Sequence, residues 1–169
     1  MKKVVATLAI ISILVMAFSF RSSNSETEFS KESLATNLTT IDNKDISFEE
    51  ILKQHKGKTV VIDVWASWCS DCIKSMPQVK ELKANYSDVA FVNLSCDKTF
   101  EAWKNGIEKH EVSGDNYLIK DGMKGEFGKS IKLDWIPRFI VVDKKGKIAL
   151  FRAIEKDFDL IKETIEKNK

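Results

Sequence analysis

The sequence has few of the residues that build cross-linked scaffolds or metal centres. Among 169 residues there are only 3 Cys and 2 His, too few for a disulfide-rich framework or for a structural zinc site with ligands to spare. Proline and glycine are also scarce, at 2 and 7 residues, which excludes collagen-like and low-complexity chains. The composition, 43% apolar and 31% charged, is that of an ordinary globular protein, and the length fits one domain.

An excess of charge of one sign is absent as well. The 27 Lys and Arg residues nearly balance 25 Asp and Glu residues, so the chain has no basic surplus of the kind that binds nucleic acid. Two of the lysines precede an apolar run over residues 4–18, which is followed by small residues up to Ser19. This pattern is typical of a secretory signal peptide, and we expect residues 1–19 to be removed on export. An uncleaved anchor is the alternative, although the run is short for a membrane span of about 20 residues.

The rest of the chain predicts a tether followed by one folded domain. Residues 20–40 are rich in Ser, Thr, Asn and Glu without a sustained apolar period, which indicates a polar tether that can end in an edge strand. Residues 41–169 alternate expected strands and helices and finish in a hairpin, which predicts an α/β domain with a mixed central β-sheet flanked by helices. The expected strands cover residues 59–66, 89–95, 116–119, 138–142 and 147–152, and the expected helices cover 47–55, 70–86, 97–110, 125–131 and 157 onward.

Two of the three cysteines form a Cys-x-x-Cys motif, Cys69 and Cys72, between an expected strand and an expected helix. Free N–H groups at a helix N-terminus stabilise a thiolate on the first cysteine, and the spacing lets the second sulfur close a disulfide. A permanent structural disulfide would close too small a loop to stabilise the fold much. Zinc would need two further ligands, and no paired motif supplies them among the remaining Cys96, His55 and His110. Thiol redox chemistry is therefore the favoured interpretation.

Further titratable residues invite both a functional and a structural interpretation. Asp63 is the only charged residue in an apolar strand, so burial should raise its pKa and let it exchange protons near neutrality. The structural alternative is a carboxylate paired with a lysine such as Lys58. Cys96 is expected to be a small buried apolar residue. His55 and His110 end predicted helices and are expected at the surface.

Two motifs resemble those of a known family. The segment from Asp63 to Cys72 resembles the active-site segment of thioredoxins, and Ile136-Pro137 resembles the loop where these proteins carry a cis-proline facing the cysteines. The signal peptide and the hairpin over residues 139–148 are more similar to the exported TlpA/ResA branch. The stretch from Ser95 to Pro137 is long enough for that branch's additional helix and strand. The resemblance thus implies a thioredoxin fold with a TlpA/ResA-type helix–strand insertion before the cis-proline.

The resemblance also implies roles for the cysteines and for one acid. Cys69, nearer the helix end and expected to be the more exposed, would attack a partner disulfide, and Cys72 would resolve the mixed disulfide. Asp63 matches the buried acid that in thioredoxins assists deprotonation of the second cysteine. Pro137, the backbone of Ile136 and the ring of Trp68 would contact an extended substrate segment.

Residues between and beside these motifs depart from the family pattern. Ser70 and Asp71 occupy the positions between the cysteines that tune the redox potential. Many relatives have Pro or His where this chain has Asp71, whose carboxylate opposes a thiolate on Cys69 by about 1 kcal/mol. That energy corresponds to about 20 mV toward the reducing end, so we expect a reductant. Arg138 stands where a small residue is common and places a cation near the site.

The function that the resemblance implies is reduction of disulfides in exported proteins, with apocytochrome c as one client class. It implies disulfide-containing protein substrates and a membrane electron donor of the DsbD/CcdA kind. No nucleic acid partner, cofactor or metal is expected, and the protein is expected to act as a monomer in the periplasm or cell envelope. A peroxiredoxin-like peroxidase is disfavoured because its threonine-to-cysteine motif is absent. A non-catalytic thioredoxin-like binding module is disfavoured because both cysteines and Pro137 are present.

Overall fold

A computed structural model describes residues 26–169; the expected signal peptide and the first residues of the expected tether lie outside that range. Seven strands form one sheet in the order β2-β1-β5-β4-β3-β6-β7. The strands are β1 (Asn37–Thr40), β2 (Asp45–Ser47), β3 (Val60–Trp65), β4 (Ala90–Ser95), β5 (Asp115–Leu118), β6 (Arg138–Val142) and β7 (Ile148–Ala153). The helices are α1 (Lys31–Ala35), α2 (Phe48–Gln54), α3 (Ser70–Asn85), α4 (Phe100–His110), α5 (Glu126–Ser130) and α6 (Phe158–Asn168).

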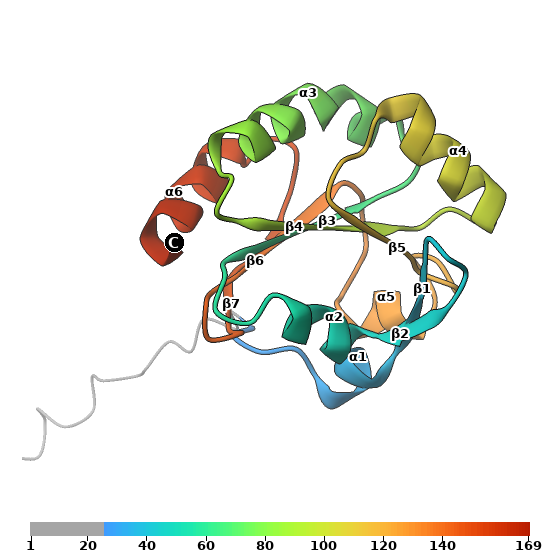
Figure 1. Cartoon of the computed structure of the whole chain (residues 1–169), viewed down its shortest axis with the longest axis horizontal. Helices are drawn as coiled ribbons and strands as arrows, with labels where there is room; N and C mark the ends of the chain where they lie inside the picture. The colour runs from blue at the N-terminus through green and yellow to red at the C-terminus, as the bar shows by residue number, and fades with distance from the viewer. Residues whose placement is uncertain (1–25) are drawn as a thin grey trace, which may run out of the picture.

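The sheet is mixed, as predicted. The neighbours β3, β4 and β5 run parallel, whereas β1, β2, β6 and β7 pair antiparallel to their neighbours. Helices cover both faces, with α3 and α4 on one side of the sheet and α1, α2 and α5 on the other (Figure 1). Since β3 is central and covered on both faces, its sequence is an almost unbroken apolar, β-branched run. Because β3 and β4 run parallel, their C-terminal ends lie side by side, with Trp65 opposite Ser95.

Alternate residues of β3 supply the two apolar layers. Ile62 belongs to a cluster that includes Phe48 of α2, whereas Val61 belongs to a second cluster with Leu82 of α3 and Ile161 of α6. This division follows from the two-residue period of a strand, whose successive side chains point to opposite faces. The two layers hold β3 rigidly, so the residues that follow Trp65 start from a fixed point.

The fold begins earlier than the composition suggests. Part of the segment assigned to the tether forms α1, capped by Ser30, whose Oγ accepts the N–H of Ser33 at 3.1 Å. The segment continues into β1, which lies inside the sheet between β2 and β5. Leu38 on β1 is fully buried. The strand considered for the end of this segment is an edge strand, because scattered apolar residues in a polar stretch do not indicate pairing on both sides. The capping box expected at the start of α2 is present, formed by Ser47 and Glu50.

Helix α4 also starts later than predicted. Its N-cap is Thr99, whose Oγ1 accepts the N–H of Ala102 at 3.1 Å, and not Asp97, whose carboxylate contacts the loop after β3. Between β4 and Pro137 the chain forms α4, β5 and α5, and a TlpA/ResA-type insertion in this segment stays a prediction. Among residues 26–169, no helix is long and apolar enough to cross a membrane.

Candidate active site

The two paired cysteines lie at the N-terminus of α3. Cys69 is the N-cap of this helix and Cys72 lies in its first turn, and their sulfurs form a disulfide with the Cα atoms 5.3 Å apart. The N–H of Cys72 donates to Sγ of Cys69 at 3.1 Å. This N–H is one of the first-turn donors that have no acceptor within the helix. After reduction, the same donor would stabilise a thiolate on Cys69.

Both cysteines are buried in the oxidised protein. Cys69 is 6% exposed and Cys72 is 3% exposed, so the difference in exposure expected between them is small. Trp68, just before the pair, is 58% exposed. Access to the sulfurs is therefore narrow, and the exposed ring beside them offers an apolar surface to a partner.

The loop before β6 lies against Cys69. The Ile136–Pro137 peptide bond is cis, and the carbonyl oxygen of Ile136 lies 3.6 Å from Sγ of Cys69. Pro137 has no N–H, so the loop directs no amide proton of that residue toward the sulfurs. Trp135 is 53% exposed, so this loop, like the segment before Cys69, displays an exposed indole.

Arg138 supports this loop instead of pointing its charge at the sulfurs. It is buried, and its guanidinium donates to Oδ1 of Asp134 at 2.6 Å and to the carbonyl of Arg152 at 2.8 Å. Arg152 contacts the other carboxylate oxygen of Asp134, and this interaction lowers the pKa of Asp134. The guanidinium of Arg138 is thus held by Asp134, at the start of the loop, and by the backbone of Arg152 on β7.

Asp63 is placed on β3 with its side chain toward α3. It keeps some solvent exposure, but its Oδ1 is buried and has no hydrogen-bond partner among the described residues. Burial raises the pKa of Asp63 to about 6, and the positive charge of Lys83 on α3 opposes the shift. Lys83 donates to Oδ1 of Asn93 at 3.0 Å, and burial lowers its own pKa. The neighbouring lysine is therefore Lys83, not the Lys58 considered from the sequence.

Asp97, the first residue of the helix expected over 97–110, instead supports the active-site loop. Its carboxylate is buried and accepts hydrogen bonds from three donors: the N–H of Ser67 at 3.1 Å, the hydroxyl of Ser67 at 2.7 Å and the hydroxyl of Ser95 at 2.8 Å. Ser67 also lies against Gly106 of α4, where an added Cβ would come within 2.5 Å of the serine Cβ. Asp97 and Gly106 thus fix the turn that leads into Cys69. The available signal was a polar Ser-x-Asp at the end of a buried strand.

The third cysteine, Cys96, lies in an environment that disfavours its thiolate. Cys96 is buried and free, and burial together with the negative charges of Asp97 and Asp121 raises the pKa of its thiol to about 12. Such a thiol is almost entirely protonated at neutral pH and is a poor nucleophile. The structural role expected for Cys96 agrees with this environment.

The positions between the paired cysteines are open to solvent to different degrees. Ser70 is exposed, and Asp71 is partly exposed. The Asp71 carboxylate lies 3.4 Å from Nζ of Lys74, one turn along α3. This ion pair offsets part of the negative charge that the sequence analysis assigned to Asp71 alone.

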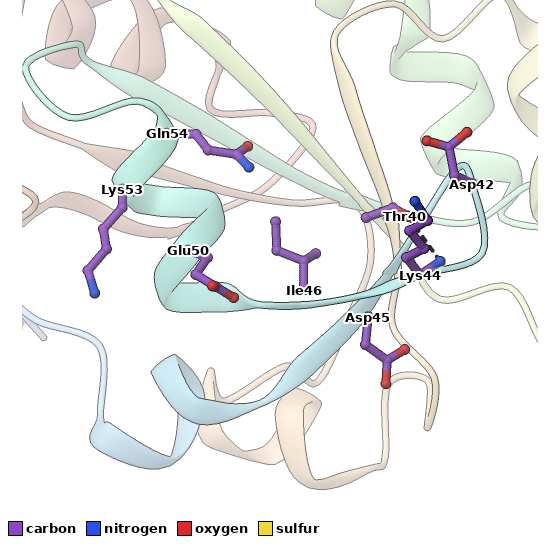
Figure 2. A pocket seen from close by; sticks show the side chains of 8 residues that line it. All are labelled: Thr40, Asp42, Lys44, Asp45, Ile46, Glu50, Lys53 and Gln54. Carbon is purple, nitrogen blue, oxygen red and sulfur yellow. Dashed lines mark hydrogen bonds between the residues drawn. The ribbon is translucent and has the colours of Figure 1, made fainter.

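A separate hollow of about 640 Å³ lies between the β1–β2 hairpin and α2 (Figure 2). Its lining includes Thr40, Asp45, Glu50 and Lys53 but no cysteine, histidine or predicted site residue. It lies on elements that cover the other face of the sheet from α3. Within the described part of the chain, no three His, Cys, Asp or Glu side chains converge as metal ligands.

A cysteine pair at a helix N-terminus, facing a cis-proline across the edge of a mixed sheet, defines a thiol–disulfide oxidoreductase site. Comparisons with known proteins agree. A family model for thioredoxin-like proteins matches residues 57–148. The thiol-disulfide oxidoreductase ResA of Bacillus thuringiensis subsp. konkukian is 30% identical over 123 residues, covering 72% of this chain and 67% of that protein. The chain therefore belongs to the thioredoxin-like family of thiol–disulfide oxidoreductases.

Solved structures resemble the fold over most of its length. A Bacteroides vulgatus protein assigned as a thiol-disulfide oxidoreductase is 33% identical, with a TM-score of 0.64, covering 88% of this chain and 91% of its own. A thiol-disulfide oxidoreductase from Bacteroides fragilis is 25% identical, with a TM-score of 0.65, covering 76% of this chain and 95% of its own. The mixed sheet flanked by helices is thus a thioredoxin fold, as the sequence motifs predicted.

Proposed function

We propose that this protein reduces disulfides of exported proteins through Cys69 and Cys72. The observation that carries the proposal is the placement of Sγ of Cys69 between the first-turn N–H of Cys72 and the carbonyl of Ile136, at 3.1 and 3.6 Å. The first contact stabilises a thiolate. The second places that sulfur beside the backbone against which an extended substrate segment would align.

The reaction proceeds in two exchanges. The Cys69 thiolate attacks one sulfur of the substrate disulfide, which forms a mixed disulfide and releases the other substrate sulfur as a thiolate that takes a proton from water. Cys72 then loses its proton and attacks Cys69, which releases the second substrate thiolate and closes the Cys69–Cys72 bond. Two electrons pass to the substrate, and the protein becomes oxidised.

Asp63 is the group proposed to accept the proton of Cys72. A carboxyl whose pKa is raised to about 6 by burial can bind and release a proton near neutral pH, unlike an ordinary exposed aspartate. The same face of α3 that carries Cys72 continues one turn later with Met76, which lines a cavity together with Asp63. The acid and the second cysteine therefore belong to one layer between β3 and α3.

Substrate binding is assigned to the exposed surface around Pro137. Trp68 and Trp135 offer two exposed indoles, and the backbone of Ile136 is the proposed pairing partner for an extended peptide. Exposed aromatic rings contribute apolar contact without requiring one particular substrate sequence. The proposed substrates are accordingly disulfide-containing proteins with a locally extended segment, among which apocytochrome c is a candidate.

The cellular setting follows from the N-terminus and from electron balance. The signal-like residues 1–19 support export to the periplasm or cell envelope, either as a released protein or on an uncleaved anchor. Each round of reduction leaves the Cys69–Cys72 disulfide, which another protein must reduce. A membrane electron donor of the DsbD/CcdA kind is the proposed source, and the protein is proposed to act as a monomer.

Replacing Cys72 with Ser tests this division of labour. Cys72→Ser leaves Cys69 able to attack but removes the resolving thiol, so mixed disulfides with client proteins should accumulate and be released by dithiothreitol. Cys69→Ser/Cys72→Ser is the matched control and should trap nothing, and Cys72→Ser/Cys96→Ala should trap as well as Cys72→Ser. Insulin-disulfide reduction with a peroxide-consumption assay on the wild type separates the alternatives. Peroxide consumption without insulin reduction would favour the peroxidase, and neither activity would favour the binding module.

A further inference from the structure

A narrow cavity lies between β3, α3 and the end of α4. Its walls include Asp63, Trp65, Val79, Lys83, His110 and Val112. Its volume is about 20 Å³, and a cavity needs only about 10–15 Å³ to hold one water molecule. The space therefore has room for a single water among polar side chains.

Three of these wall residues carry a buried polar atom without a hydrogen-bond partner among the described residues. They are Oδ1 of Asp63, Nε1 of Trp65 and Nε2 of His110. A buried polar group without a partner destabilises the fold, and buried water makes about three hydrogen bonds to such groups. One water in this cavity would satisfy all three: the indole N–H donates to it, and it can donate to the carboxylate and to the imidazole.

We infer that this cavity binds a water molecule that relays protons between Asp63 and His110, and that His110 passes them to solvent. The inference rests on the proposed role of Asp63 in deprotonating Cys72. It goes beyond that role by giving the proton a route out of the layer between β3 and α3. His110 was expected to be an ordinary surface residue. Its side chain is instead partly buried, with Nε2 enclosed.

The proton balance is as follows. Cys72 transfers its proton to the Asp63 carboxylate and attacks Cys69 as a thiolate. The protonated Asp63 donates its proton to the cavity water, which simultaneously donates one of its own to Nε2 of His110. The imidazolium then loses its Nδ1 proton to solvent. Asp63 returns to its starting form, His110 is left as the tautomer protonated at Nε2, and one proton leaves for each disulfide formed in the protein. When the pair is reduced again, a proton passes inward along the same route to Cys72, and His110 takes a proton from solvent at Nδ1, which restores its first tautomer.

The other charged groups around the cavity differ in their exposure to solvent at its two ends. From α3, Lys83 faces Asp63, and Lys80 pairs with Glu111 at 2.7 Å. Glu111 follows His110 directly, and its side chain is 82% exposed. The relay therefore ends beside a solvated ion pair, where a proton can pass to bulk water, whereas the Asp63 end is enclosed.

Water in the cavity can be detected without any assay of activity. In the ¹⁵N-labelled full chain, the Nε1 proton of Trp65 should show a cross-relaxation peak with water. The Nε1 proton of Trp103 is the matched control, because this indole is also buried and unpartnered but does not line the cavity. Single Trp→Phe variants assign the two signals. Absence of the water peak at Trp65, or equal peaks at both indoles, would overturn the inference.

The role of His110 is tested by the kinetics of one turnover. The reduced protein is mixed with insulin in weak buffer at pH 7–8, and oxidation of the cysteine pair is followed by the fluorescence of Trp68. His110→Ala should slow the turnover five- to tenfold, and added imidazole should restore most of the rate. His55→Ala is the matched control and should be unchanged, because His55 lies by Asp115 at 3.0 Å and not in the cavity wall. Val79→Ile, which fills the cavity, should slow turnover without imidazole rescue.

An unchanged His110→Ala rate, or a loss that imidazole does not repair, would show that His110 carries no protons. A wild-type protein that does not react with insulin would instead contradict the proposed function. In that case the water peak at Trp65 would still decide whether the cavity binds water. The two failures are therefore distinguishable.

Discussion

The regions that follow β3 and β4 are neighbours with similar residues, but their cysteines differ in expected reactivity. The strands run parallel, with Trp65 opposite Ser95, and each is followed by a cysteine and a helix. At the β3 end, Cys69 caps α3 and accepts an N–H from its first turn. At the β4 end, Cys96 is buried, and Thr99 caps α4 in its place. With similar topology, the Cys69 sulfur has a backbone N–H donor, whereas the Cys96 sulfur has none among residues 26–169.

The acids of the two regions differ in the opposite way, because here the hydrogen-bond donors lie at the β4 end. Asp97, after β4, has donors for both carboxylate oxygens. Asp63, within β3, has a buried Oδ1 without a hydrogen-bond partner in the described part of the chain. A satisfied buried carboxylate rigidifies its surroundings, whereas an unsatisfied one shifts its pKa and exchanges protons. Among the acids, proton exchange is therefore expected at the buried carboxylate that lacks a hydrogen-bond donor, whereas the carboxylate with donors holds the neighbouring loop in place.

The largest expected difference is between the two sulfurs as nucleophiles. In the reduced protein at pH 8, Cys69 should react with iodoacetamide at least about a hundredfold faster than Cys96, because a thiol with a pKa of about 12 contains very little thiolate. Mass spectrometry after timed quenching measures both rates. In guanidinium chloride the rates should converge. A Cys96 that reacts in the native protein as fast as Cys69 would contradict this contrast.

A smaller effect, of opposite sign in the two regions, is expected for the acids. Asp63→Asn should increase the free energy of unfolding at pH 8 by roughly 2–3 kcal/mol, since a carboxyl raised from an unfolded pKa of about 3.9 to about 6 opposes folding when ionised. The destabilisation that Asp63 causes in the wild type should shrink as the pH falls from above 6 toward 4, where Asp63 becomes protonated, so most of the gain of Asp63→Asn should be lost there. Denaturant titrations of the oxidised proteins at pH 8 and pH 4 measure both.

Asp97→Asn is the matched comparison for that measurement. It should decrease stability by about 1–3 kcal/mol, because an amide cannot accept from all the donors at Ser67 and Ser95. Equal signs for the two substitutions would remove the distinction between a compensated and an uncompensated acid.

The smallest expected effect concerns the residue between the paired cysteines. Asp71→Asn removes a negative charge near Cys69 and should make the couple more oxidising by at most about 20 mV, which corresponds to about 1 kcal/mol. The ion pair with Lys74 reduces the effect, and Asp71→Asn/Lys74→Gln controls for it. Equilibration with glutathione buffers measures the potential. A more reducing Asp71→Asn protein would contradict the tuning assigned to Asp71.

Some features could be predicted because they depend on neighbours in the chain. The run of β-branched residues in β3 predicts a central strand, and Ser47 with Glu50 predicts a capped helix, because both are local preferences. The sequence signal was weaker where a few buried contacts determine the structure. The segment before residue 41 is polar, and one buried leucine on β1 does not reveal that it pairs inside the sheet.

By itself, the sequence determined the class of chemistry: a Cys-x-x-Cys after a buried strand, a proline loop and a lone acid in an apolar strand are local patterns with a short-range cause. Only the tertiary structure decided what surrounds them. Lys83 lies near Asp63, and His110 lines a cavity together with that acid. Asp97 accepts a hydrogen bond from Ser67. These contacts form because packing brings α3, α4 and β4 together. Hydrogen bonds and desolvation act over a few ångströms of space, and such distances are set by the packing of elements far apart in the chain.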